Sequence, residues 1–167
     1  MNFETPEPGA TTAPVAASPI HLKNILVPLD FSEVSLKSLQ YAVPLAKQFG
    51  AKLTLLHVLN APVRFVDSAY LASLGHHQLT VIEKKIEDMI PADVAVETAV
   101  RQNFVTEGIL EVAREIGADL IITTTHGCTG MKHLLMRNTA EQVVRQAPCP
   151  VLVLHEHEHD FVDPLPT

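Results

Sequence analysis

The chain has 167 residues, a length typical of a single domain. Its hydrophobic content of 47% is enough for a packed core, and the absence of tryptophan leaves that core mainly to aliphatic side chains. The formal net charge of −7 argues against nucleic acid as a partner, and no apolar run approaches the ~18 residues that a membrane span requires.

Both ends of the sequence are predicted to lie outside the folded domain. Residues 1–22 are rich in proline, alanine and threonine, and they lack the basic and apolar regions of a signal peptide. They predict a disordered arm, with a partner-docking segment as the alternative. The regular pattern occupies residues 23–156, and residues 157–167 are predicted to be a flexible tail. The only cysteines, Cys128 and Cys149, form no CxxC motif, which favours a reduced, cytoplasmic protein.

The first regular elements are a strand, a helix and a second strand. The apolar run Asn24–Leu29 predicts a strand. A helix follows, with Ser32 as its N-cap and Gly50 at its end, and Pro44 inside it predicts a kink or a local break. The run Lys52–Leu59 predicts the next strand.

The rest of the chain continues this alternation. The patterns predict helices over Leu71–Ile90, Thr106–Gly117 and Asn138–Ala147, and strands over Val94–Val100, Ala118–Thr124 and Pro150–His155. Alternating strands and helices with largely apolar strands are typical of an α/β protein with an open parallel sheet and helices on both faces. Ligands of such sheets bind at the carboxyl ends of the strands, where the strand order reverses.

One loop has the composition of a phosphate-binding turn. Gly127 and Gly130 permit close backbone approach, and Thr129 between them adds a hydroxyl donor. Asn138 is a good N-cap, so the helix predicted to begin there would offer free N–H groups to an anion. His126 adjoins the loop as a further donor, although a structural role is favoured for it.

Four segments in order resemble the universal stress protein family: "NILVPLDFS", "LTLLHV", "GADLIITTTHGCTGMKHLL" and "NTAEQVVRQAPCPVLVL". They are spread in this order over about 130 residues of the chain, from Lys23 to His155. The resemblance implies a Rossmann-like, adenine-nucleotide alpha-hydrolase-like fold with a five-stranded parallel sheet in the order 3-2-1-4-5. It also implies a homodimer, and either ATP or AMP binding, with Mg²⁺, or no nucleotide at all.

The resemblance also assigns site residues. Asp30 stands where the family's aspartate lies near adenine and ribose, and Val58 where a backbone group meets adenine. The family's glycine-rich phosphate pattern falls on Thr124, Gly127, Arg137 and Asn138, of which only Gly127 matches. The candidate nucleotide-binding residues are Pro28, Leu29, Asp30, Val58, Thr124, His126, Gly127, Thr129, Gly130, Arg137, Asn138 and Thr139.

The departures leave two hypotheses open. Arg137 has a guanidinium that pairs well with phosphate, but its bulk can fill the phosphate's place. Thr124 adds a branched side chain at the point where the strand order reverses, which narrows the site. The favoured hypothesis is a stress-response module with a degenerate site and weak or no ATP binding. The alternative is a nucleotide-dependent switch that binds ATP or AMP.

Other chemistry has less support in the sequence. There is no Walker motif, and no histidine is placed by sequence to activate Ser32, so we expect no enzyme activity. Three alternate histidines, His155, His157 and His159, have strand spacing for a metal pocket, but a solvated chain end is favoured and no metal is expected. The last strand would be a bare apolar edge, which predicts a homodimer through Val151, Leu152, Val153 and Leu154.

Overall fold

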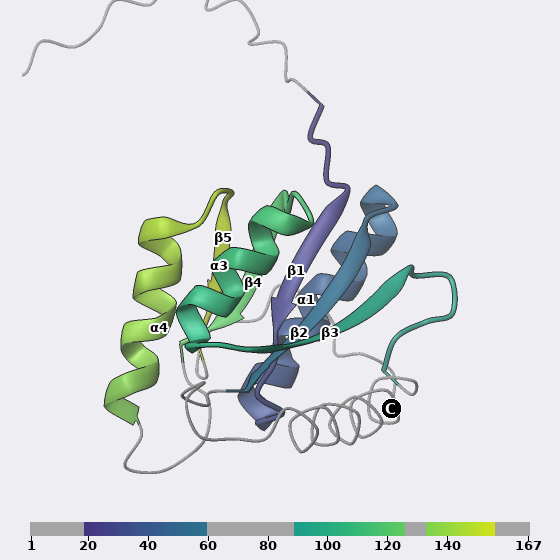
Figure 1. Cartoon of the computed structure of the whole chain (residues 1–167). Helices are drawn as coiled ribbons and strands as arrows, with labels where there is room; N and C mark the ends of the chain where they lie inside the picture. The colour runs from purple at the N-terminus through teal and green to yellow at the C-terminus, as the bar shows by residue number, and fades with distance from the viewer. Residues whose placement is uncertain (1–18, 60–88, 126–132, 156–167) are drawn as a thin grey trace, which may run out of the picture.

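The computed structural model describes residues 19–59, 89–125 and 133–155, with side chains of the last range from residue 139 onward. Its centre is a five-stranded parallel sheet in the order β3-β2-β1-β4-β5 (Figure 1). The strands are β1 (Asn24–Pro28), β2 (Lys52–Leu59), β3 (Val96–Gln102), β4 (Leu120–Thr124) and β5 (Val151–Leu154). The helices are α1 (Glu33–Phe49), α3 (Val105–Glu115) and α4 (His133–Gln146). The predicted fold class and strand order are confirmed.

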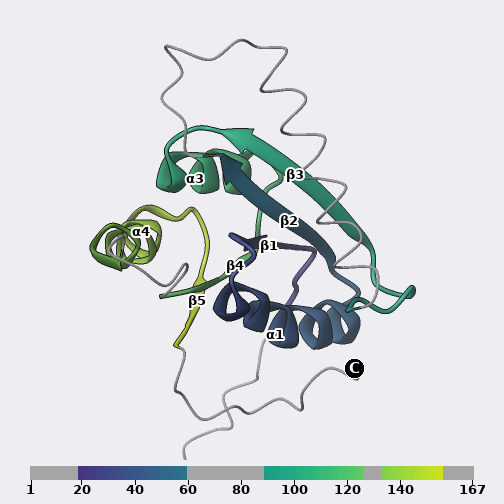
Figure 2. The ribbon, with the colours of Figure 1, turned by 90° about the horizontal axis from the view of Figure 1, so that it is seen from below.

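Helices cover both faces of the sheet, with α1 on one face and α3 and α4 on the other (Figure 2). Side chains alternate along each strand, so a central strand supplies both layers of the core. On β1, Ile25 and Val27 pack into the layer that contains α1, while Leu26 packs into the layer of α3 and α4. This two-sided burial explains why the central strands are almost uniformly apolar in sequence.

Helix α1 has the predicted ends. The Ser32 side chain accepts a hydrogen bond from the Ser35 N–H, and Gly50 adopts a left-handed φ of 63° at the C-cap. A kink or a local break was expected at Pro44, and the break is wrong, because the helix continues from Glu33 to Phe49 with Pro44 inside it. Pro44 is exposed, which leaves its ring away from the packed face of the helix.

Most other boundaries differ from the predictions by one or two residues, and the starts of β3 and α4 have a physical explanation. Val94 precedes the third strand, because its N–H bonds to the Pro91 carbonyl in a turn, and β3 runs from Val96 to Gln102. Helix α4 begins at His133, so the prediction that a helix starts at Asn138 is wrong. The intervening residues include leucine, methionine and arginine, which favour helix and extend it toward the N-terminus.

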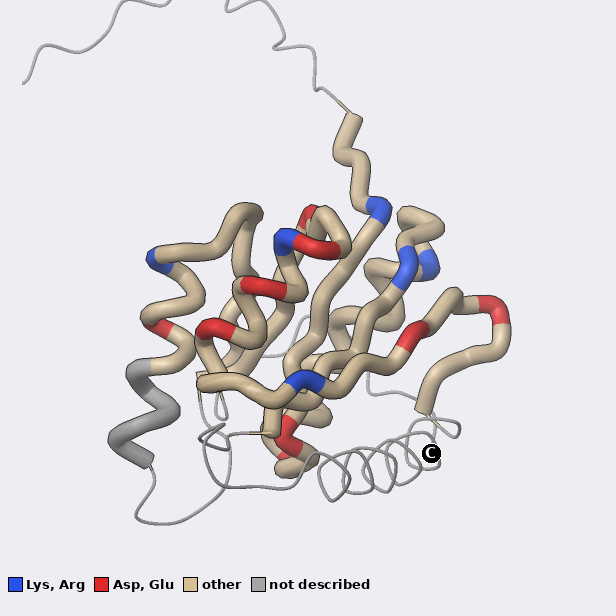
Figure 3. The backbone as a smooth tube through the Cα atoms, in the orientation of Figure 1, with Lys and Arg blue, Asp and Glu red and all other residues tan. Residues whose placement is uncertain are grey.

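Charged residues are unevenly distributed over the described chain. Figure 3 shows that basic and acidic residues gather around the amino edge of the sheet and along α3, and that few lie at the carboxyl edge. Within the described ranges, no helix has the length and apolar character needed to cross a bilayer.

Candidate functional site

Strands β1 and β4 lie side by side, with Ile25 opposite Leu120 and Leu26 opposite Ile121. The chain leaves β1 toward α1 on one face and, by the strand order, β4 leads toward α4 on the other. The carboxyl ends of these two strands therefore form the point at which the sheet reverses its winding, where ligands of such sheets bind. Pro28, Leu29, Asp30 and Thr124 all lie at this edge, as predicted.

The turn after β1 is fixed by its own hydrogen bonds. Asp30 Oδ1 accepts from the Ser32 N–H at 3.0 Å and from the Ser32 hydroxyl at 2.6 Å. Between them, Phe31 has a φ of 65°, a left-handed conformation that costs a bulky L-residue about 1–2 kcal/mol. The turn is therefore strained and held in one geometry, with the Asp30 carboxylate at its corner.

Strand β2 extends beyond β1. The β1 pairing ends with Pro28 opposite Leu56, whereas the β3 pairing continues to Leu59 opposite Gln102. The Leu56 carbonyl accepts from the Leu29 N–H on the β1 side. Because backbone groups alternate direction along a strand, the N–H and carbonyl of Val58 also face the β1 side. They lie past the last paired residue of β1, next to the Asp30 turn.

The residue before Val58 contacts this turn directly. His57 Nδ1 lies 2.8 Å from the Leu29 carbonyl oxygen. A carbonyl only accepts, so Nδ1 carries the proton in this contact. The His57 ring also lies against Phe31, with ring centroids 4.7 Å apart. His57 thus contacts the residues on both sides of Asp30, a role that the sequence analysis did not assign to it.

The other face of β2 packs closely on α3. A Cβ placed on Gly108 would lie 3.0 Å from Val58 Cγ1, which is tighter than ordinary packing. The absence of a side chain at Gly108 therefore lets the first turn of α3 lie close to Val58 without displacing it.

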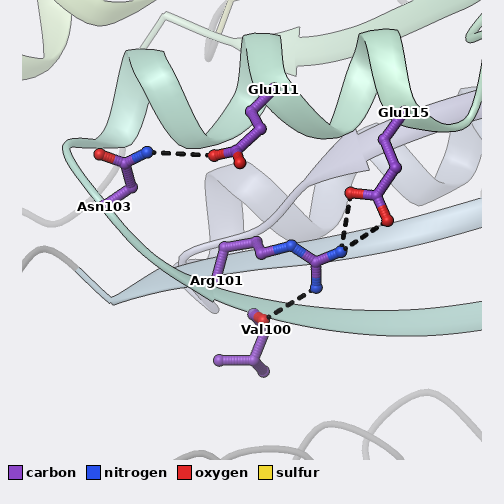
Figure 4. A network of polar contacts seen from close by, with 5 residues as sticks. All are labelled: Val100, Arg101, Asn103, Glu111 and Glu115. Atoms are coloured by element: carbon purple, nitrogen blue, oxygen red, sulfur yellow. Dashed lines mark hydrogen bonds and ion pairs between the residues drawn. The ribbon is translucent and has the colours of Figure 1, made fainter.

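The ends of β3 and α3 are tied together by a polar network (Figure 4). Arg101 bonds to both carboxylate oxygens of Glu115, at 3.1 and 2.9 Å. Asn103 accepts from the Phe104 N–H and donates to Glu111 at 3.2 Å. This network ties the end of β3 to the middle of α3 through Glu111 and to its last residue through Glu115.

The strands on the other side of β1 have their own linkage. The Thr125 N–H bonds to the Leu154 carbonyl at 3.0 Å, and its hydroxyl lies 3.0 Å from His155 Nδ1. The Lys37 ammonium reaches the His155 carbonyl at 3.5 Å. His155 thus contacts the residue that follows β4 and a lysine of α1, while His157 and His159 lie outside the described residues. Among the residues that the structure describes, no group of three or more metal-ligating side chains occurs.

The phosphate-binding part of the predicted site is only partly described. His126, Gly127, Thr129 and Gly130 lie outside the described residues, as does Cys128. Arg137 and Asn138 are described by their backbone, which is inside α4, and Thr139 is half-buried. Because α4 begins at His133, the amide of Asn138 is not one of the free N–H groups at the helix start.

Cys149 is half-buried just before β5, in the layer that contains α3 and α4. Burial raises the pKa of its thiol, and the charge of Asp119 raises it further. The thiolate is therefore disfavoured, and this cysteine has the character of a packing residue.

Comparison with known proteins agrees with the fold and with the order of the segments. The model of the universal stress protein family matches residues 21–155. The chain belongs to the universal stress protein family. A universal stress protein of Methanocaldococcus jannaschii is 32% identical over 142 residues, which cover 79% of this chain and 81% of that protein.

Solved universal stress protein structures have the same fold. One, a universal stress protein in complex with cAMP, has a TM-score of 0.66 at 20% identity, over 83% of this chain and 100% of that one. Another, from Arabidopsis thaliana with AMP bound, has a TM-score of 0.54 at 15% identity, over 81% of this chain and 92% of that one. At these identities the likeness concerns the fold.

Proposed function

We propose that this universal stress protein is a non-enzymatic, cytoplasmic stress-response module that binds adenine nucleotides weakly, mainly through their adenosine part. The single observation behind this proposal is the backbone of Val58, which faces the β1 side of the sheet beside the Asp30 turn. Adenosine would lie at the carboxyl ends of β1 and β4. Relatives of the same fold bind cAMP and AMP, which is consistent with this ligand class.

The adenosine half of the site is supported by the described residues. The N–H and carbonyl of Val58 provide one donor and one acceptor, the pair that an adenine edge recognises. Asp30 is fixed by Ser32, so its carboxylate is preorganised to accept from a ribose hydroxyl. Preorganisation lowers the entropic cost of binding and so favours affinity.

The phosphate half has less support. A helix N-terminus attracts phosphate through N–H groups that lack partners within the helix. In this chain α4 begins at His133, so the amides of Asn138 and Thr139 are used within the helix. We therefore expect phosphates to add little affinity, so that AMP and ATP bind alike even with Mg²⁺.

Equilibrium titration with adenosine, AMP and Mg²⁺–ATP tests this proposal. The expected result is saturable binding of all three with affinities within about fivefold, which corresponds to about 1 kcal/mol. GMP and GTP serve as controls for the base. Lack of saturation by any adenosine compound at millimolar concentration would remove nucleotide binding, and ATP binding a hundredfold tighter than AMP would favour the nucleotide switch.

The double variant Arg137→Gly with Asn138→Ser tests the phosphate half by itself. Glycine disfavours the helix interior by about 1 kcal/mol, and serine is a preferred N-cap, so together they favour a helix start at residue 138. We expect ATP affinity to rise while adenosine affinity stays constant. Equal gains for ATP and adenosine would contradict this explanation.

We also propose a homodimer formed through β5. This strand lies at one end of the sheet, and Val151, Leu152 and Val153 are half-buried in the single chain. An isologous contact would cover this apolar edge. Sedimentation of a Val153→Lys variant should show monomer, while Val96→Lys on the opposite edge strand β3 should leave the dimer intact. A monomeric wild type, or dissociation by both variants, would contradict the proposal.

A further inference from the structure

The hydrogen bond between His57 and Leu29 occurs where the ladder between β1 and β2 would otherwise continue. The last β1–β2 bond joins the Leu29 N–H to the Leu56 carbonyl. In a regular parallel ladder the Leu29 carbonyl would next accept from the Val58 N–H. In this protein it accepts from the His57 imidazole at 2.8 Å. A side chain has taken the place of the next backbone donor.

This substitution has a consequence for the backbone of Val58. Leu29 is only 4% exposed, and a carbonyl in such surroundings requires a donor. Because His57 supplies it, the Val58 N–H is not drawn into the ladder with Leu29. The same bond keeps β1 from extending into the Asp30 turn, since a longer ladder would require extended backbone there.

The His57 ring also supports the strained part of the turn. Phe31, with its φ of 65°, packs against the ring with centroids 4.7 Å apart. An aromatic contact of this kind offsets part of the cost of the left-handed conformation. One imidazole thus contacts both the residue before Asp30 and the residue after it.

We infer that His57 is a positioning residue: it holds the Leu29 carbonyl, and thereby leaves the Val58 N–H for an adenine ring and keeps Asp30 at the corner of its turn. The inference rests on the proposed function for its ligand. The replacement of the Val58 N–H by the His57 imidazole as donor to the Leu29 carbonyl does not depend on any ligand being bound.

Amide hydrogen exchange at Val58 tests the inference without nucleotide. In His57→Leu the Leu29 carbonyl loses its donor, and we expect the Val58 N–H to replace it and to exchange at least about tenfold more slowly. His57→Asn retains an N–H donor at nearly the Nδ1 position, so Val58 should exchange as in the wild type. His21→Leu, which removes an exposed imidazole elsewhere, is the matched control.

Nucleotide titration of the same variants gives the second readout. Loss of one hydrogen bond to the base is expected to weaken AMP binding about tenfold in His57→Leu, with affinity restored in His57→Asn.

The outcomes separate this inference from the proposed function. Slower Val58 exchange in His57→Leu, with no AMP binding by the wild type, supports the positioning role and removes the nucleotide. Unchanged Val58 exchange in a folded His57→Leu overturns the inference, whatever the protein binds. If His57→Leu does not fold, His57→Asn decides, since altered exchange or affinity in that variant contradicts a donor role.

Discussion

The two edges of the sheet use hydrogen bonds in opposite ways. At the amino edge, Asp119 Oδ2 accepts from the backbone N–H groups of Lys23 and Asn24, and the Asn24 amide donates to the Ile116 carbonyl. These bonds join β1 to the segment before β4. At the carboxyl edge, Ser32 donates to the Asp30 carboxylate and His57 donates to the Leu29 carbonyl. These bonds fix the turn after β1, and the backbone of Val58 faces that turn. The amino edge is closed by these bonds between β1 and the segment before β4, whereas the carboxyl edge is where we propose that the nucleotide binds.

The largest expected effect is at the amino edge. Asp119→Ala removes the acceptor of two backbone N–H groups, and hydrogen bonds to a charged group contribute about 1.5–3 kcal/mol. We expect the free energy of unfolding in urea to fall by about 2 kcal/mol, with AMP affinity unchanged. A matching loss of AMP affinity in the folded variant would show that the two edges are not independent.

A smaller loss of stability is expected at the carboxyl edge. Ser32→Ala removes the N-cap of α1, which costs about 1 kcal/mol. It also removes the hydroxyl that holds Asp30, so we expect AMP affinity to fall several-fold. The comparison of edges predicts that the ratio of affinity loss to stability loss is higher for this variant than for Asp119→Ala. Nucleotide titration and urea unfolding together give this ratio for each variant, and equal ratios for the two variants would contradict the prediction.

Gly108→Ala should have a smaller effect with a sign that depends on its neighbour. Alanine favours helix, but its Cβ would lie 3.0 Å from Val58 Cγ1, and overpacking by one methyl group costs about 1 kcal/mol or more. We expect a net loss of less than about 1 kcal/mol in the wild type and a gain in a Val58→Ala background. Thermal unfolding of the wild type, the two single variants and the double variant gives the coupling energy between residues 58 and 108. Additive effects would show that the close contact does not affect stability.

The smallest expected effect is on the pH dependence of stability. Backbone hydrogen bonds, first from Lys23 and then from Asn24, lower the pKa of Asp119 below its ordinary value of 3.8. The stabilisation is therefore complete above that value and is lost as the pH falls through the lower, folded-state pKa. Asp119→Asn keeps an acceptor but does not ionise.

Ion pairs with Lys47 and Lys52 also lower the pKa values of Asp93 and Glu97. Because these carboxylates titrate in the same range, the test compares the variant with the wild type. As the pH falls from about 5 to about 2, roughly the range over which such a carboxylate titrates, the free energy of unfolding should fall less in Asp119→Asn than in the wild type. Parallel losses in urea unfolding at each pH would contradict a contribution from Asp119.

The sequence predicted the parts of the fold that depend on regular patterns. Strand order followed from the family resemblance, and Ser32 and Gly50 marked the ends of α1 correctly because caps have local chemical causes. The start of α4 was wrong because Asn138 is a good cap that the preceding helix-forming residues override.

The candidate site residues were named mainly from the family resemblance, and their roles stay predictions. Asp30 and Val58 were named, but His57 and Gly108 were not, because their roles depend on contacts between separate elements. An imidazole in the otherwise apolar second half of β2, between Leu56 and Val58, was the available signal for His57. The glycine-rich loop was predicted to bind phosphate from the spacing of its glycines. This role stays a prediction because residues 126–132 lie outside the described residues.

The central position of β1 has a consequence for how the chain is made. Its partners on one side come from β2, but on the other side they come from β4, and Lys23 and Asp119, which close that junction, are 96 positions apart. During synthesis, β1 and α1 leave the ribosome long before the strand that completes their sheet. We therefore expect the early half to stay an incomplete, chaperone-accessible intermediate, and closure of that long chain loop to limit the folding rate.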